Sequence, residues 1–274
     1  MRKKLLYFAV FTAISFFAHT QTVRVPVSSA FTKLNAYSTT YVNAFSFGAN
    51  QAALASLQNF SAAIFSERRF LLKELSFYSL ALGLPTSHGN FGFKADYFGD
   101  ATNNESGLGI SYGRKLGERI DLGVQFNYYN HKIAGYGSAS AINAEGGLIL
   151  HLTEGLNFGI HIYNPTGVKI GKIAEEKLPA AYSAGFGYEL SKKFYIGFEV
   201  EKIEEQPVNI NVAVQYYFQE KMIASAGITS VSSSYFFGFG VWLKSFQINA
   251  VATIHPQLGI TPGLLLLFKK EKSE

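Results

Sequence analysis

Alternation of apolar and polar residues is the feature that most constrains the fold of this chain. From residue 122 to 128, every second position is apolar and the positions between are small or carry an amide: Leu122, Val124, Phe126 and Tyr128 alternate with Gly123, Gln125 and Asn127. Successive side chains leave a β-strand on opposite sides, so the pattern predicts a strand with one apolar face. A closed sheet in a bilayer accounts for both faces, with apolar side chains toward lipid and polar ones toward a lumen.

Fourteen stretches follow this pattern, and most are about 9 to 13 residues long, as expected of tilted strands that cross a bilayer. They are residues 59–67, 73–85, 89–99, 106–116, 119–130, 141–153, 155–163, 179–190, 194–203, 207–218, 222–230, 233–243, 246–254 and 259–268. The sequence therefore predicts an all-β protein, a transmembrane antiparallel β-barrel of about 14 strands, although a count of twelve stays open. A soluble β-sandwich would also alternate, but its outward face would carry Lys, Glu and Thr.

The connections alternate between tight turns and longer loops. Tight turns follow the even-numbered strands at residues 117–118, 154, 191–193, 219–221 and 244–245, whereas residues 100–105, 131–140 and 164–179 form longer loops. Short periplasmic turns and longer outer loops are the rule for outer-membrane barrels. Two connections do not fit the rule, because residues 68–72 look short for an outer loop and residues 85–89 look long for a turn.

The first 20 residues have the features of a cleaved secretory signal peptide. Arg2, Lys3 and Lys4 precede a short apolar run, residues 5–17, and a small-residue cleavage site at residues 18–20. An uncleaved anchor is the alternative. Removal of the three basic residues lowers the net charge from +5 to +2, so the charge gives no argument for nucleic-acid binding. We expect export to the outer membrane of a Gram-negative bacterium.

Residues 21–58 do not alternate cleanly, and we interpret them as a segment that plugs the lumen. Residues 43–55 favour a short helix with an Asn cap, and their aromatic and Ala-rich composition suits a solvated leader, the alternative, poorly. The predicted organisation is a signal peptide at 1–20, a plug at 21–58, a barrel at 59–268 and a polar tail at 269–274.

Charged residues that the alternation places inside the lumen are the candidate site residues: Lys94, Asp96, Glu145 and Glu199. Ionisable groups at membrane depth usually pair with one another. We expect Glu199 to pair with a cation, either Lys94 or a plug residue such as Arg24 or Lys33. As the role of these inward-facing charges, we favour anchoring of the plug to the wall over lining a path for a substrate.

The sequence shows no convincing catalytic or metal-binding motif. Cysteine is absent, and the six histidines lack the spacing of a metal site. His151 and His161 could point into the lumen, where hydrogen bonding is the favoured role over metal binding. Glu199 and Glu201 share one face of a strand and could form a carboxylate pair. We predict a protein that is not an enzyme and has no cofactor, with a barrel enzyme as a further alternative.

Three stretches resemble the long-chain fatty-acid transporter (FadL) superfamily, and most of all its PorV/PorQ branch, which is associated with type IX secretion. They are residues 43–55, 80–85 and 89–93. The resemblance implies fourteen strands and an N-terminal hatch, and it places Asn50 and Gln51 in the plug. Gln51 stands where the family has a proline, so the resemblance does not carry over the kink that proline would impose.

The resemblance also implies two functions. The first is an accessory subunit in protein secretion or outer-membrane assembly, whose partners are membrane lipid and proteins of that machinery. The alternative is a small FadL-like channel for uptake of hydrophobic compounds. The short outer loops leave little chain for a ligand lid, which favours the accessory role.

Overall fold

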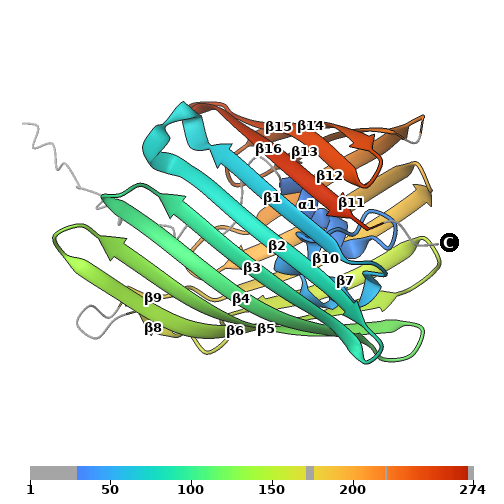
Figure 1. Cartoon of the computed structure of the whole chain (residues 1–274), viewed down its shortest axis with the longest axis horizontal. Helices are drawn as coiled ribbons and strands as arrows, with labels where there is room; N and C mark the ends of the chain where they lie inside the picture. Colours follow the sequence, from blue (N-terminus) through green and yellow to red (C-terminus); the bar gives the residue numbers. More distant parts are fainter. Residues whose placement is uncertain (1–29, 171–175, 220, 271–274) are drawn as a thin grey trace, which may run out of the picture.

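The computed structural model describes residues 30–170, 176–219 and 221–270, and fourteen strands form a closed antiparallel barrel (Figure 1). The strands are β1 (Ser61–Arg68), β2 (Ser76–Thr86), β3 (Gly89–Gly99), β4 (Asn103–Lys115), β5 (Ile120–Ile133), β6 (Gly137–His151), β7 (Leu156–Tyr163), β10 (Ala181–Ser191), β11 (Phe194–Ile203), β12 (Asn209–Phe218), β13 (Met222–Thr229), β14 (Ser234–Leu243), β15 (Phe246–His255) and β16 (Gly259–Lys269). Each strand pairs with the next barrel strand along the chain, and β1 pairs with β16 to close the ring.

The predicted all-β antiparallel barrel is confirmed, with fourteen strands rather than twelve. The bounds of β3 and β11 coincide with the predicted ranges 89–99 and 194–203, whereas β6 starts at Gly137 and not at residue 141. The predicted signal peptide, residue Arg24 and the last residues of the predicted tail lie outside the described residues.

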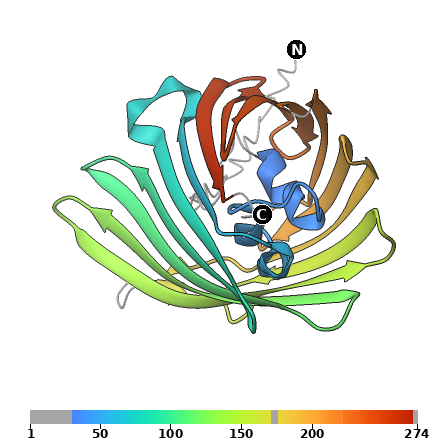
Figure 2. The same ribbon diagram turned by 45° about the vertical axis from the view of Figure 1, so that its right-hand side comes forward.

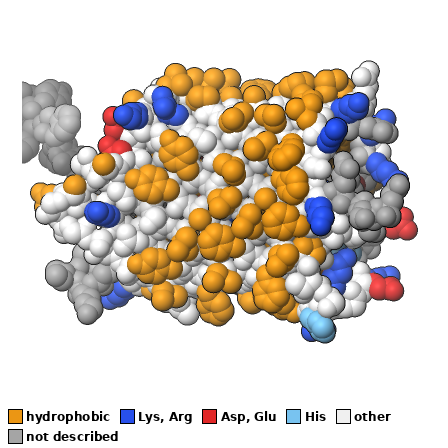
Figure 3. Space-filling model, in the orientation of Figure 1, with side chains coloured by type: hydrophobic (Ala, Val, Ile, Leu, Met, Phe, Trp, Pro, Cys, Tyr) orange, Lys and Arg blue, Asp and Glu red, His pale blue; other side chains and the backbone are white. Residues whose placement is uncertain are grey.

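The two faces of the wall follow the alternation. On β5, Leu122, Val124 and Phe126 are exposed on the outer face, whereas Gln125 is buried on the inner face. On the face drawn in Figure 3, apolar side chains gather over the middle of the outer wall. This division is what a strand between lipid and a filled lumen requires.

The connections after β2, β4, β6, β10, β12 and β14 span two to four residues and lie at one end of the barrel, the short-turn end. At the other end, the prediction of longer loops at residues 100–105 and 131–140 is wrong. Main-chain pairing of Asn103 with Ile133 and of Ile133 with Gly137 extends the strands, so only residues 100–102 and 134–136 connect them.

The two connections that did not fit the rule do so in the structure: the β1–β2 loop spans residues 69–75 and contains the 3-10 turns η4 (Arg69–Leu71) and η5 (Lys73–Leu75), and the β2–β3 turn is only Ser87–His88. The longest connection, between β7 and β10, contains the short hairpin β8 (Lys169–Ile170) and β9 (Glu176–Lys177). Its Ile170 and Leu178 pack against Tyr129 and Ala141 of the inner face.

The N-terminal segment, residues 30–58, lies inside the barrel (Figure 2). It contains the helix α1 (Ala30–Leu34) and the 3-10 turns η1 (Asn35–Tyr37), η2 (Ser46–Gly48) and η3 (Gln51–Ser56). The helix predicted within residues 43–55 is thus two 3-10 turns, η2 and η3. The side chain of Asn50 caps η3 by accepting a hydrogen bond from the Ala52 amide at 3.1 Å. No helix among the described residues is long and apolar enough to span a membrane.

Candidate functional site

Glycines form the part of the inner wall against which the N-terminal segment packs. A Cβ atom added to any of these glycines would lie 3.1 Å or less from an atom of the segment. The glycines come from eight consecutive strands of the barrel, β2 to β7, β10 and β11: Gly83, Gly92, Gly113, Gly123, Gly147, Gly159, Gly185, Gly187 and Gly197. We call these residues the glycine wall. A wall without side chains lets the segment backbone approach the strand backbone directly. At Gly123 the added Cβ would lie 2.2 Å from the carbonyl carbon of Gln51.

The structure places Asn50 and Gln51 against this wall, and both are fully buried. The Nδ2 atom of Asn50 donates to the main-chain carbonyl of Ile160 at 3.1 Å and lies 3.3 Å from that of Leu148. The side-chain amide of Gln51 has no hydrogen-bond partner within the described structure. Asn50 therefore fixes the segment to β6 and β7, while Gln51 contributes mainly through the contact of its backbone with the wall.

Glu199 is a main anchor point for the segment on β11. Its carboxylate accepts hydrogen bonds from the Tyr37 hydroxyl at 2.7 Å and from the Asn211 amide at 3.1 Å, and the Nζ of Lys33 lies 4.0 Å away. Lys33 forms its closest ion pair with Glu201, at 3.0 Å. The cation beside Glu199 is thus the segment residue Lys33 and not Lys94, which corrects one of the predicted pairings.

Lys33 and Tyr37 belong to the segment, and their environments change their proton affinities. Burial would lower the pKa of Lys33, but the charges of Glu201 and Glu199 outweigh it and hold that pKa above its usual value. Burial, together with the Glu199 charge, raises the pKa of the Tyr37 hydroxyl well above its usual value. Lys33 therefore stays charged and Tyr37 stays a hydrogen-bond donor at neutral pH.

A second anchor was not identified from the sequence. Glu189 of β10 accepts hydrogen bonds from the backbone amides of Thr39 and Thr40, at 2.7 and 3.0 Å, and from the Ser38 hydroxyl at 2.7 Å. The Tyr195 hydroxyl of β11 donates to the carbonyl of Leu34. A run of Ser and Thr in residues 38–40 was a usable sign of a polar contact, but no pattern in the sequence indicated its partner.

Lys94, Asp96 and Glu145 line the lumen away from the Glu199 anchor. Lys94 and Asp96 pair with each other on β3, with 2.8 Å between Nζ and Oδ2. Glu145 of β6 accepts a hydrogen bond from the Asn127 amide at 2.8 Å, and His161 Nε2 lies 2.8 Å from its other oxygen. The predicted lumen residues thus form separate pairs and not one cluster.

The two histidines considered for a metal site lie in different places. His151 Nε2 lies 3.0 Å from Asp121, whereas His161 contacts Glu145. Over residues 30–170, 176–219 and 221–270, no group of three or more His, Cys, Asp or Glu side chains could hold a metal ion. Both histidines act as hydrogen-bonding residues of the inner wall.

A cavity of about 930 Å³ lies above the N-terminal segment on the side of the longer loops. Lys33, Gly48 and Ala49 of the segment face it. Phe70, Phe77, Phe98 and Leu258 form an apolar sector of its lining, and the ion pairs of Lys94, Glu145, Glu199 and Glu201 form a polar sector. Arg69 stacks on Phe98, 5.2 Å from the ring centroid, and pairs with Glu67 at 3.0 Å.

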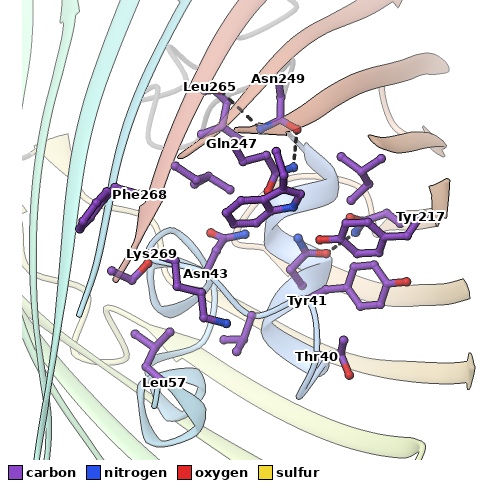
Figure 4. A pocket seen from close by; sticks show the side chains of 17 residues that line it. Thr40, Tyr41, Asn43, Leu57, Tyr217, Gln247, Asn249, Leu265, Phe268 and Lys269 are labelled. Carbon is purple, nitrogen blue, oxygen red and sulfur yellow. Dashed lines mark hydrogen bonds between the residues drawn. The ribbon is translucent and has the colours of Figure 1, made fainter. Parts of the chain in front are cut away.

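A much smaller cavity of about 50 Å³ lies on the other side of the segment, against β12 to β16 (Figure 4). Tyr41, Asn43, Tyr217, Gln247 and Asn249 line it (Figure 4). Its volume suits a water molecule or two and excludes an organic ligand.

Comparison with known proteins identifies solved structures that share the fold. No family model matches the sequence, and no curated protein matches it. Solved structures do match. The CymD monoaromatic hydrocarbon channel aligns over 85% of this chain and 94% of its own, with 12% identity and a TM-score of 0.60. The Pseudomonas putida toluene transporter TodX aligns over 82% and 93%, with 9% identity and a TM-score of 0.58.

A Pseudomonas aeruginosa FadL homologue aligns over 89% of this chain and 97% of its own, with 11% identity and a TM-score of 0.57. At such identities the likeness concerns the fold and not the ligand. The chain therefore has the fold of FadL-type outer-membrane channels.

Proposed function

We propose that this protein is a non-enzymatic outer-membrane barrel that admits a small hydrophobic molecule to the 930 Å³ cavity. The observation that carries the proposal is the apolar sector of Phe70, Phe77, Phe98 and Leu258 in a cavity that is large enough for an organic ligand. Concave sites with mostly apolar walls and a few placed polar groups are typical of small-molecule binding. Channels named for hydrocarbons share the fold, which supports the same proposal.

The N-terminal segment forms the floor of this cavity, so we expect it to act as a plug. Its residues from Leu34 to Leu57 are mostly buried against the wall. A filled lumen leaves no continuous water path for ions. The proposed barrel is therefore one that binds a hydrophobic solute but conducts ions poorly.

The PorV/PorQ-like role as a partner in secretion stays a prediction. The filled lumen favours it as a second candidate, because a partner subunit needs no transport path. The two candidates differ in one measurable property: a hydrophobic-solute barrel binds its solute in the cavity, and a partner subunit does not need to. Export through a signal peptide at residues 1–20 likewise stays part of the proposal.

Filling the cavity tests the proposal. Gly107 faces the cavity, and an added Cβ would meet no atom closer than 3.9 Å, so we expect Gly107→Phe to place its ring in the space for a ligand. We expect purified Gly107→Phe to retain toluene at least tenfold more weakly than the unaltered protein in equilibrium dialysis, because a phenyl ring takes the place of the solute.

The matched control is Ile110→Phe on the outer face of the same strand, where Ile110 is 66% exposed. It should retain toluene as the unaltered protein does. Equal retention by all three proteins would refute binding in the cavity and would leave the partner role as the better candidate.

A further inference from the structure

The short-turn end of the barrel carries nine exposed Lys and Arg side chains. They lie on or directly beside the β4–β5, β10–β11, β12–β13 and β14–β15 turns and at the end of β16, and one of them, Lys269, also lines the small cavity. The nine are Arg114, Lys115, Arg119, Lys192, Lys193, Lys221, Lys244, Lys269 and Lys270. We call this set the basic collar. Among the described residues, two exposed carboxylates lie on turns at the same end: Glu118 on the β4–β5 turn and Glu154 on the β6–β7 turn.

The collar differs from the cations inside the barrel. Lys33, Lys94 and Arg69 each pair with a carboxylate, and so does Lys177 at the loop end. Within the described part of the chain, no ion pair joins a collar side chain to an acid. Nine cations against two exposed carboxylates leave the described part of this end with a net positive charge, which attracts counter-charge from outside.

The collar also borders the apolar outer wall. Arg114 follows Ile110 and Tyr112 on the outward face of β4, and Lys244 follows the exposed Leu243 at the end of β14. At this end, which lies on the right of Figure 3, Lys and Arg side chains flank the apolar surface. A cation just beyond a lipid-facing apolar residue lies at the depth of the lipid headgroups.

We propose that the basic collar binds the anionic headgroups of phospholipids in the leaflet around the short-turn end. The collar is spread over four turns and the end of β16, so it fits a continuous anionic layer better than a protein partner, which would face one side. Lys and Arg both recognise phosphate oxygens. Because short turns face the periplasm, the leaflet concerned is the periplasmic one. This inference does not depend on the ligand of the cavity.

Energy transfer from Trp242, the only tryptophan in the sequence, can measure the interaction. Trp242 lies near the end of β14, next to the collar. The detergent-purified barrel is titrated with pyrene-labelled phosphatidylglycerol or, separately, with pyrene-labelled phosphatidylcholine. We expect tighter binding of phosphatidylglycerol, weakened by salt, since headgroup attraction is screened beyond a Debye length.

The decisive variant removes the three cations of the β4–β5 turn: Arg114→Gln, Lys115→Gln and Arg119→Gln. At about 1 kcal/mol per cation, we expect phosphatidylglycerol to bind on the order of a hundredfold more weakly at low salt. The matched control removes three exposed lysines at the loop end, Lys73→Gln, Lys132→Gln and Lys202→Gln, and should leave the affinity unchanged. An unchanged gel shift on heating shows that both variants are folded.

Three results would overturn the proposal. The two lipids could bind equally, or both triple variants could lose the same affinity, which would mean that the collar has no special role. An acidic peptide such as polyglutamate could compete better than phosphatidylglycerol, which would assign the collar to an acidic protein.

Discussion

Lys33 is the residue whose charge connects the N-terminal segment to the barrel. It pairs with Glu201 at 3.0 Å, and Glu199 lies 4.0 Å from the same nitrogen. The sequence indicated that Glu199 needed a cation and offered Lys33 among the candidates. It gave no indication of Tyr37, because a hydroxyl in a non-alternating stretch has no pattern that points to a distant acid.

The pairing of Lys33 predicts an alkaline transition. Because the pKa of Lys33 is raised in the folded state, its stabilising contribution is complete below the usual lysine value near 10.4 and is lost as the pH rises through the folded value. We expect the segment to loosen in this range, with a change in the fluorescence of Trp242, which lines the small cavity beside it.

Lys33→Met provides the control for this transition. This variant lacks the titrating amine. Its free energy of unfolding at neutral pH should be lower by about 2 kcal/mol, a loss between those measured for breaking exposed and buried ion pairs. Its fluorescence should show tyrosine titration only. A transition of equal size in both proteins would mean that Lys33 does not hold the segment.

At the scale of elements, the strands were predictable and the packing of the segment was not. Period-two alternation determines which side chains of β5 or β12 face lipid, so those faces follow from local sequence. The side-chain hydrogen bonds between residues 30–58 and the strands join residues at least 33 positions apart, and such contacts leave no periodic pattern in the sequence. The same reason explains why the inward packing of Ile170 and Leu178 was not foreseen.

The glycine wall should be sensitive to the smallest side chain. A Cβ at Gly123 would lie 2.2 Å from Gln51, whereas a Cβ at Gly146, one strand away, would meet no atom closer than 3.7 Å. We expect Gly123→Ala to destabilise the segment by about 1–3 kcal/mol through overpacking. Limited proteolysis should then cleave within residues 30–58 faster than in the unaltered protein.

Gly146→Ala is the matched control and should be cleaved as slowly as the unaltered protein. If Gly123→Ala resisted cleavage equally well, the close approach of segment and wall would not contribute to stability.

At the scale of the whole molecule, the closed ring and its apolar exterior predict a detergent-dependent protein. β1 pairs with β16 through seven residue pairs, so no strand edge is free in the barrel. We expect the unheated protein in SDS to migrate differently from the boiled protein, because the closed barrel resists the detergent until it is heated. Monodisperse behaviour in plain buffer without any amphiphile would contradict a membrane barrel.

The bare glycine wall also bears on how the molecule is assembled. Where the strands offer only peptide backbone, the N-terminal segment fills the lumen, and this segment is synthesised before any strand. The ring is complete only when β16, the last strand, reaches β1. During insertion into the membrane, the strands must therefore close around a segment that was synthesised before them, and this segment ends at the centre of the barrel.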